Sequence, residues 1–201
     1  MASSAGEEAA LVVSRLREAG YEALFAGGCV RDLLLGREPR DYDVATSAPV
    51  SVVERLFDRT VSVGAQFGVV KVLGEIGDVE VATFRRDGPY HDSRHPSEVY
   101  PSDARGDAER RDFTINGMFL DPATGRVDDF VGGRADLEAG RIRAIGDPAE
   151  RFAEDRLRLI RAIRFAARFD FEIEAATWAS IRELSHTISG IAWERIGDDD
   201  M

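Results

Sequence analysis

Residues 21–46, YEALFAGGCVRDLLLGREPRDYDVAT, contain the pattern that decides the fold. The apolar run at 21–26 predicts a strand, and the paired glycines Gly27-Gly28 end it. A short helix is expected through Leu35, followed by a turn and a second strand that begins at Asp41. The order of strand, paired glycines, helix, turn and strand predicts a sheet with a binding loop at its edge.

The same stretch contains the first candidate site. Glycines between a strand and a helix let backbone N–H groups approach a triphosphate closely, and Arg31 lies one turn into the helix. The period of a strand places Asp41 and Asp43 on one face, where hard oxygen ligands suit Mg²⁺. A glycine turn beside a surface Asp-x-Asp is the alternative, but the combination of both features favours a nucleotide site.

The flanking segments predict an α+β fold. An amphipathic helix is expected at 7–19, and three runs rich in β-branched residues follow at 60–63, 69–73 and 79–84. A turn that contains glycine separates the last two, which predicts a hairpin in a mixed, mainly antiparallel sheet. Glu80 interrupts the last strand, so it either faces solvent or points into a site.

The second half of the chain changes character. Residues 85–109 show no sustained period, which predicts a long loop and a candidate active-site lid. A helix is expected at 112–120, and short strands with glycine-rich turns at 126–145. From about Gly146-Asp147 onward the pattern becomes helical, over 148–169 and again over 174–188.

The composition bounds the class of protein. The chain has 201 residues, of which 44% are hydrophobic and 31% charged, as in a soluble globular protein with one domain or one domain and the start of another. It shows no apolar run of membrane-spanning length and no targeting segment, so we expect no membrane and a cytoplasmic location. The single cysteine, Cys29, excludes an internal disulfide and predicts a packing role.

The net charge of −11 argues against a protein that coats nucleic acid, because phosphate binding uses clustered Lys and Arg. The basic residues, however, are almost all arginine and gather locally, at 85–86, 110–111 and 156–168. This local clustering is typical of specific phosphate and base contacts.

Two arginine motifs follow. In Arg110-Arg111-Asp112-Phe113-Thr114-Ile115-Asn116-Gly117 the arginines suit bidentate phosphate contacts, whereas the alternative is a surface ion pair with Asp112 as a helix cap. In the segment 154–165 four polar residues recur every third position and predict a polar ridge on a helix: Asp155, Arg158, Arg161 and Arg164. Arg164 shares a side with Leu157 and Ile160, so it should meet a carboxylate or a phosphate. Structural ion pairs between helix and sheet are the alternative.

These motifs, Gly27-Gly28-x-Val30-Arg31-Asp32 with Asp41-x-Asp43, the segment 110–116, and Glu154-Asp155-x-x-Arg158, occur in order and at suitable spacing. Together they resemble the bacterial and eukaryotic class of tRNA nucleotidyltransferases, the CCA-adding enzymes, with the related bacterial poly(A) polymerases. The similarity extends from Ala23 to Phe171.

The resemblance implies a polymerase-β-like nucleotidyltransferase head over 1–146 and a helical, nucleotide-selecting neck over 147–201. It implies that Asp41 and Asp43 are catalytic ligands of Mg²⁺, with Glu80 as the third catalytic carboxylate. The implied nucleotide-binding residues are Gly27, Gly28 and Arg31 for the triphosphate, Arg111 with Asp112 for the incoming nucleotide, Asp155 and Arg158 for the Watson–Crick edge of CTP or ATP, and Arg161 and Arg164 as support for that pair or for the phosphates.

The implied substrates are the tRNA 3′ end, CTP and ATP, with no obligate protein partner. Relatives continue into helical body and tail domains, which we expect to be absent here, with weak RNA affinity as the consequence. CC-only addition, A-only addition and poly(A) addition stay open as alternatives, as does a nucleotide-binding module without catalysis. Residues 63–70 resemble the CCA-adding pattern more, and intact Asp41 and Asp43 speak against the non-catalytic module.

Overall fold

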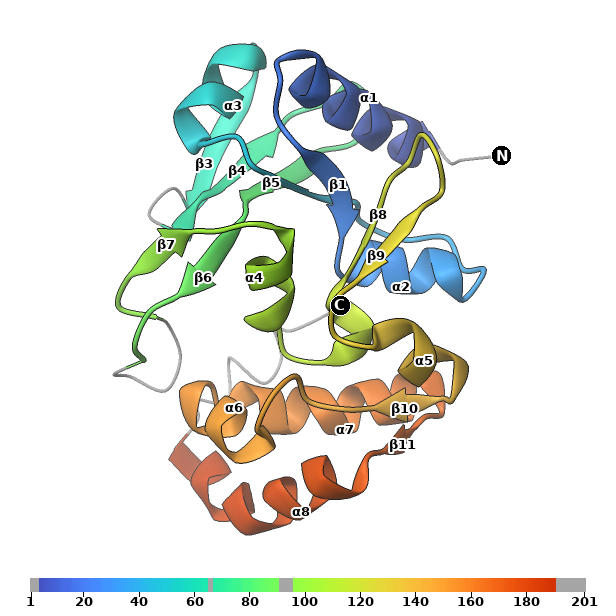
Figure 1. Ribbon diagram of the computed structural model, residues 1–201, viewed down its shortest axis with the longest axis vertical. Helices are drawn as coiled ribbons and strands as arrows, with labels where there is room; N and C mark the ends of the chain where they lie inside the picture. The colour runs from blue at the N-terminus through green and yellow to red at the C-terminus, as the bar shows by residue number, and fades with distance from the viewer. Residues whose placement is uncertain (1–3, 65–66, 91–95, 191–201) are drawn as a thin grey trace.

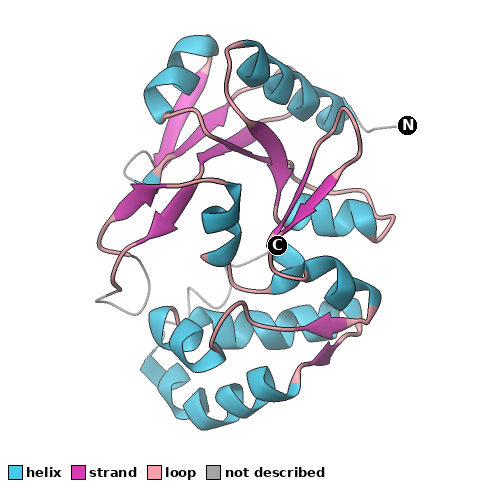
Figure 2. Ribbon diagram, viewed as in Figure 1, coloured by secondary structure: helices cyan, strands magenta, loops and turns pink. Residues whose placement is uncertain are grey.

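A computed structural model describes residues 4–64, 67–90 and 96–190 of the chain. A sheet with its covering helices forms one part of the molecule, and the C-terminal helices gather at the other end (Figures 1 and 2). The helices are α1 (Ser4–Glu18), α2 (Gly28–Leu34), α3 (Val50–Leu56), α4 (Ala104–Glu109), α5 (Gly133–Glu138), α6 (Pro148–Glu154), α7 (Leu157–Phe169) and α8 (Ala175–Leu184), with 3₁₀ turns at Thr114–Asn116 and Ser185–Gly190.

The main sheet has seven strands in the order β3-β4-β5-β2-β1-β8-β9. These strands are β1 (Ala23–Ala26), β2 (Asp43–Thr46), β3 (Thr60–Gly64), β4 (Val69–Val72), β5 (Val79–Thr83), β8 (Met118–Leu120) and β9 (Val127–Asp129). Only β2 and β5 pair in parallel, and every other neighbouring pair is antiparallel. The predicted mixed, mainly antiparallel sheet and the β4–β5 hairpin are therefore confirmed.

Strand β1 is buried on both faces of the sheet. Its four residues are all buried. Ala23 and Phe25 belong to the main core with α1 and α3, whereas Leu24 and Ala26 pack in a second cluster with Ala104 and Ala108 of α4. An unbroken apolar run is what a strand buried on both sides requires.

The C-terminal helices share the main core with the sheet. The buried face of α7 presents Leu159, Ala162, Phe165 and Phe169, which belong to one cluster with Phe113 and Ile142. The rings of Phe113 and Phe165 meet edge to face at 5.8 Å. Among the described residues, none of the helices combines the length and apolarity needed to cross a bilayer.

Four expectations for the second half of the chain were wrong in detail. The helix expected at 112–120 is a 3₁₀ turn followed by β8, because strand pairing with β1 and β9 overrides the local pattern. Residues 126–145 include the helix α5 between their short strands. The helix expected at 148–169 is broken between α6 and α7.

The fourth concerns the expected loop at 85–109. It contains β6 (Arg85–Asp87) and β7 (Val99–Pro101), which pair antiparallel, and then α4. Residues 91–95 of the expected lid lie outside the described residues. A further two-stranded ladder joins β10 (Arg141–Ile142) to β11 (Glu172–Ile173) in parallel.

Candidate active site

The glycine pair stands at the junction of β1 and α2. Gly27 precedes the helix with φ 72° and ψ −130°, a conformation that side chains disfavour. A Cβ at Gly27 would also lie 2.7 Å from Nη1 of Arg111. Gly28 has an ordinary φ, and a Cβ there would make van der Waals contact with Arg31 at 3.5 Å. The backbone therefore requires glycine at position 27 more strongly than at position 28.

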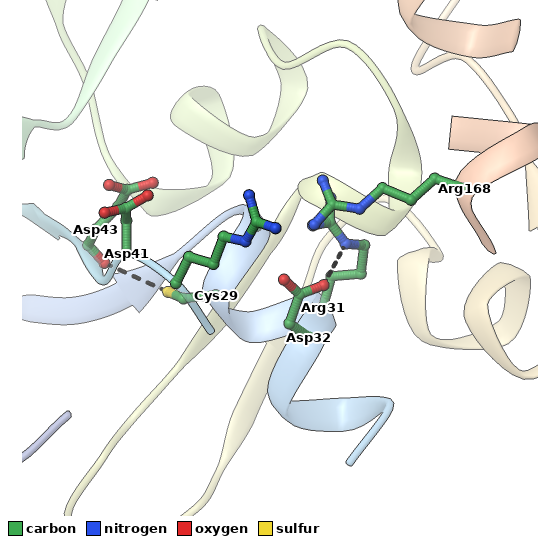
Figure 3. A pocket seen from close by; sticks show the side chains of 8 residues that line it. Cys29, Arg31, Asp32, Asp41, Asp43 and Arg168 are labelled. Atoms are coloured by element: carbon green, nitrogen blue, oxygen red, sulfur yellow. Dashed lines mark hydrogen bonds and ion pairs between the residues drawn. The ribbon is translucent and has the colours of Figure 1, made fainter. Parts of the chain in front are cut away.

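A cavity of about 150 Å³ opens beside this junction. Its lining comes from α2, the turn before β2, β2 itself and α7, and comprises Gly28, Cys29, Arg31, Asp32, Arg40, Asp41, Asp43 and Arg168. In Figure 3 the carboxylates of Asp41 and Asp43 lie beside each other at one end, and the guanidinium groups of Arg31 and Arg168 approach each other at the other. One end of the cavity thus has two carboxylates side by side, and the other end has two guanidinium groups. Cys29 is buried beneath it, as predicted.

Asp43 lies where negative charge is unfavourable. Burial, Glu80 and Asp41 raise the pKa of its carboxyl and Arg111 lowers it, and the resulting pKa is about 6. Glu80 stands next to Asp43 because the two are paired positions of the parallel strands β5 and β2. A bound cation would relieve this repulsion.

The donors of this end fit Mg²⁺, which prefers carboxylate oxygens and keeps several waters. Asp41 and Asp43 are the residues that would hold it. Within residues 4–64, 67–90 and 96–190, no group of three His, Cys, Asp or Glu side chains is close enough to hold a metal ion. Glu80 as a third ligand therefore stays a prediction.

Arg31 is buried and held from three directions. Its Nη1 donates to Oδ1 of Asn116 at 2.7 Å, and its Nε donates to Oδ1 of Asp32 at 2.9 Å. Its guanidinium also lies 5.3 Å from the ring of Phe165 and 4.6 Å from the ring of Phe169. Helix α7 therefore fixes the arginine that the sequence predicts at the triphosphate.

Arg111 is oriented by a buried carboxylate. Its Nη2 and Nε donate to Oδ2 of Asp107 at 2.8 and 3.1 Å, and Arg110 donates to Oδ1 of the same residue. Burial raises the pKa of Asp107, but Arg111 and Arg110 lower it more, so the pKa lies below its usual value. Arg111 is held close enough to Asp43 to oppose the rise in its pKa.

Asp112 and Asn116 connect Arg31 to α7. Asp112 accepts from Nε of Arg161 at 2.9 Å through Oδ2, and from Nδ2 of Asn116 at 3.0 Å through Oδ1. Burial raises the pKa of Asp112, whereas Arg161 and the hydrogen bonds lower it below its usual value. Asp112 is thus a link between segments. Asn116 bridges Arg31 and Asp112. Asn116 was not selected from the sequence as a site residue, although its position in the motif 110–117 could have pointed to it.

The predicted base-reading residues are arranged differently from the expectation. Arg158 is buried, and its Nη1 donates to Oε2 of Glu154 at 2.7 Å and to the carbonyl of Arg151 at 3.1 Å. Asp155 lies before α7, where its Oδ1 accepts from the backbone N–H of Leu157 at 3.0 Å. The polar ridge therefore begins at Arg158, and Glu154 is the carboxylate that orients it.

Six of the predicted residues line two separate cavities. Asp41, Asp43, Gly28 and Arg31 share the first, whereas Arg158 and Glu80 line a second one of about 390 Å³ with Phe67, Arg85, Tyr90 and others. The guanidinium of Arg158 lies 6.0 Å from the ring of Tyr90. Arg161 packs over Phe165 at 5.2 Å. Arg164, Leu157 and Ile160 are all partly exposed, so the expected burial of Arg164 is incomplete.

A mixed sheet that presents paired carboxylates beside a glycine turn defines the nucleotidyltransferase class of folds. Residues 23–143 match the family model described as the poly A polymerase head domain, and the chain belongs to this family.

Named relatives agree with that assignment. The CCA-adding enzyme of Bacillus pumilus is 46% identical over 185 residues, which cover 92% of this chain and 46% of the relative. The CCA-adding enzyme of Enterococcus faecalis is 46% identical over 191 residues, which cover 94% and 47%. This chain spans about half the length of the curated relatives that it matches.

Solved structures are similar over the same extent. The Bacillus stearothermophilus CCA-adding enzyme in complex with CTP superposes with a TM-score of 0.86 at 36% identity, covering 94% of this chain and 46% of that one. The Thermotoga maritima CCA-adding enzyme complexed with tRNA superposes with a TM-score of 0.75 at 28% identity, covering 93% and 43%.

Proposed function

We propose that this chain is the catalytic part of a template-independent tRNA nucleotidyltransferase that adds C, A or both to the tRNA 3′ end from CTP and ATP. The observation that carries the proposal is the first cavity, where Asp41 and Asp43 face a set of arginines across a small space. A magnesium–triphosphate complex has the complementary charges. We propose tRNA as the RNA substrate because the relatives are named CCA-adding enzymes.

The proposed role of each residue follows from the charge of its side chain. Asp41 and Asp43 hold Mg²⁺, with Glu80 as the third carboxylate, and Arg31 and Arg111 contact the phosphates. Mg²⁺ held by Asp41 and Asp43 would supply Lewis-acid chemistry for activation of the terminal 3′-hydroxyl of the RNA and for stabilisation of the departing pyrophosphate. The network through Asn116 and Asp112 keeps Arg31 and Arg161 in fixed relation to the phosphates.

Base selection belongs to α7 and the residues just before it in this proposal. Arg158 and Asp155 offer donors and acceptors to the Watson–Crick edge of CTP or ATP. Both hydrogen bonds from Arg158 to Glu154 and Arg151 use Nη1, and Nη2 is the group that we expect to donate to a base. Residues 85–109 are the segment that we propose as the lid.

The head and the neck, 1–146 and 147–201, are the proposed division of the chain. We expect the RNA affinity of this chain to be weak, because its net charge of −11 opposes binding to the phosphates of RNA. A titration that gave submicromolar affinity for tRNA at physiological salt would contradict that expectation.

The experiment supplies Mg²⁺ and labelled CTP or ATP separately to tRNAs that end before CCA, after C and after CC. Ordered addition that stops after CCA supports the proposal, and addition of CC alone or A alone indicates a specialised enzyme. No incorporation by the full chain would contradict catalysis and leave a nucleotide-binding module.

Poly(A) addition is the second candidate, because the family model that matches is that of poly(A) polymerases. Long A tails in the same assay would establish it. The sequence feature that favoured CCA addition, 63–70, includes residues 65–66, which lie outside the described residues.

A further inference from the structure

Two arginines that line the first cavity, Arg40 and Arg168, are not among the residues proposed to hold the nucleotide. The cavity lining contains three arginines and three aspartates. Arg31 and Asp32 form an ion pair with Nε and Oδ1 at 2.9 Å, which neutralises one of each. Asp41 and Asp43 form the negative end. The structure records no ion pair between a carboxylate and either Arg40 or Arg168 across the part of the chain that it describes.

Positive charge converges around Phe169 beside this cavity. The guanidinium carbons of Arg31, Arg37 and Arg168 lie 4.6, 5.3 and 5.4 Å from the centre of its ring. Figure 3 shows the guanidinium of Arg168 turned toward that of Arg31. Asp32 is the carboxylate that pairs with Arg31. The three guanidinium groups that gather on this ring form a site suited to an anion.

The alternative is that Arg168 only complements the dipole at the C-terminal end of α7, where a basic residue is common. That explanation accounts for Arg168 alone. It does not account for Arg40, which comes from the turn before β2 and lines the same cavity. Convergence of two arginines from separate segments favours a shared ligand.

We propose that Arg168 and Arg40 bind the terminal phosphates of the nucleoside triphosphate, and the pyrophosphate that those phosphates become. The inference rests on the proposed function and adds two residues to its phosphate site. Guanidinium groups suit phosphate oxygens because they donate two parallel hydrogen bonds.

The position of Arg168 gives α7 a double role. Arg158 and Arg168 are ten residues apart on this helix, so they are separated by about 15 Å along its axis at 1.5 Å per residue. An extended nucleoside triphosphate has a comparable length. One rigid helix therefore contacts the base at one end of the nucleotide and the terminal phosphate at the other.

The test compares the affinities of CTP and CMP for the full chain by calorimetry with Mg²⁺, in wild type, Arg168→Gln, Arg40→Gln and Arg168→Lys. Both glutamine variants are expected to weaken CTP binding by about tenfold or more and to leave CMP binding unchanged. Arg168→Lys should restore part of the loss, because it keeps the charge without the bidentate geometry. Arg182→Gln, an exposed arginine of α8, is the matched control and should bind CTP as the wild type does.

The outcomes separate this inference from the proposed function. A wild-type protein with no preference for CTP over CMP would overturn both. A wild-type preference that the glutamine variants retain would overturn this inference alone. Weaker tRNA binding with unchanged CTP affinity in the variants would also overturn it, because the arginines would then serve phosphates of the RNA backbone.

Discussion

At the scale of single residues, Gly27 is the position whose backbone is most constrained. Its φ of 72° and ψ of −130° are accessible chiefly to glycine. Gly27→Ala should lower the free energy of unfolding by about 1–3 kcal/mol and displace Arg111, whose Nη1 a Cβ would meet. Urea denaturation measures the loss.

Gly28→Ala is the matched control for that change, because position 28 has an ordinary φ and room for a Cβ. We expect a smaller loss of stability there. If the two variants were equally stable, the special backbone conformation of Gly27 would not be what requires glycine.

Asp121 provides a pH-dependent contact between α1 and the end of β8. It accepts from Nη1 of Arg17 at 2.8 Å and from the backbone N–H of Ala123 at 2.9 Å. Burial raises its pKa, but these hydrogen bonds lower it more, to about 2. Because the folded pKa lies below the ordinary value of about 3.9, the stabilisation is complete above pH 4 and is lost as the pH falls toward 2.

The corresponding test compares the unfolding free energies of wild type and Asp121→Asn between pH 7 and pH 3. The variant should be less stable at pH 7, and the difference should shrink at pH 3. A difference that stays constant over this range would mean that the charge of Asp121 is not its source.

At the scale of elements, a carboxylate of α4 holds the two arginines that directly follow the helix. Asp107 is 1% exposed and pairs with Arg110 and Arg111. Asp107→Asn removes the charge and leaves two arginines without their partner, so we expect a loss of about 3–5 kcal/mol in unfolding free energy. Thermal or urea denaturation measures it.

The exposed pair of Arg126 and Asp128 is the control, with side chains 65% and 22% exposed. Asp128→Asn should cost less than about 1 kcal/mol, because solvent screens exposed pairs. Equal effects of Asp107→Asn and Asp128→Asn would show that burial of Asp107 is not what makes its pair strong.

Helix α7 illustrates why some elements were predictable and others were not. Its apolar period predicted the helix, and the structure confirms it over Leu157–Phe169. The break before it was not predictable, because Asp155 accepts from Leu157 in a local cap that interrupts an otherwise helical pattern. Glu154, the last residue of α6, pairs with Arg158 of α7 across this break.

At the scale of the whole molecule, local chemistry was predictable and distant partners were not. Gly27 directly follows β1 and Asp43 lies in β2, as the sequence predicts, but Asp41 lies in the turn before β2 and not in the strand that was predicted to begin there. The strand β8 was predicted as a helix because its pairing with β1 depends on residues about ninety positions away. The bridge from Asn116 to Arg31 spans 85 positions and leaves no periodic signal in the sequence.

The single core that joins sheet and C-terminal helices also places the active site. Phe165 belongs to α7 and packs on Phe113, while two guanidiniums, Arg31 and Arg161, lie over its ring. Arg31 and Arg161, for which we propose roles at the nucleotide, therefore pack on one ring of the core that joins the proposed head to the proposed neck.

We propose that nucleotidyl transfer to RNA requires the carboxylates of the first cavity. The substitution Asp43→Asn tests this requirement. Because burial, Glu80 and Asp41 raise the pKa of Asp43 to about 6, its ionised form is costly at pH 7.5. The asparagine variant should therefore be at least as stable as the wild type by thermal denaturation.

The decisive measurement is incorporation of labelled CMP from CTP into tRNA that lacks CCA, with Mg²⁺ at pH 7.5, by wild type and by folded Asp43→Asn. We expect product with the wild type and none above background with the variant. Equal incorporation by both proteins would contradict the assignment of Asp43 and, with it, the proposed active site.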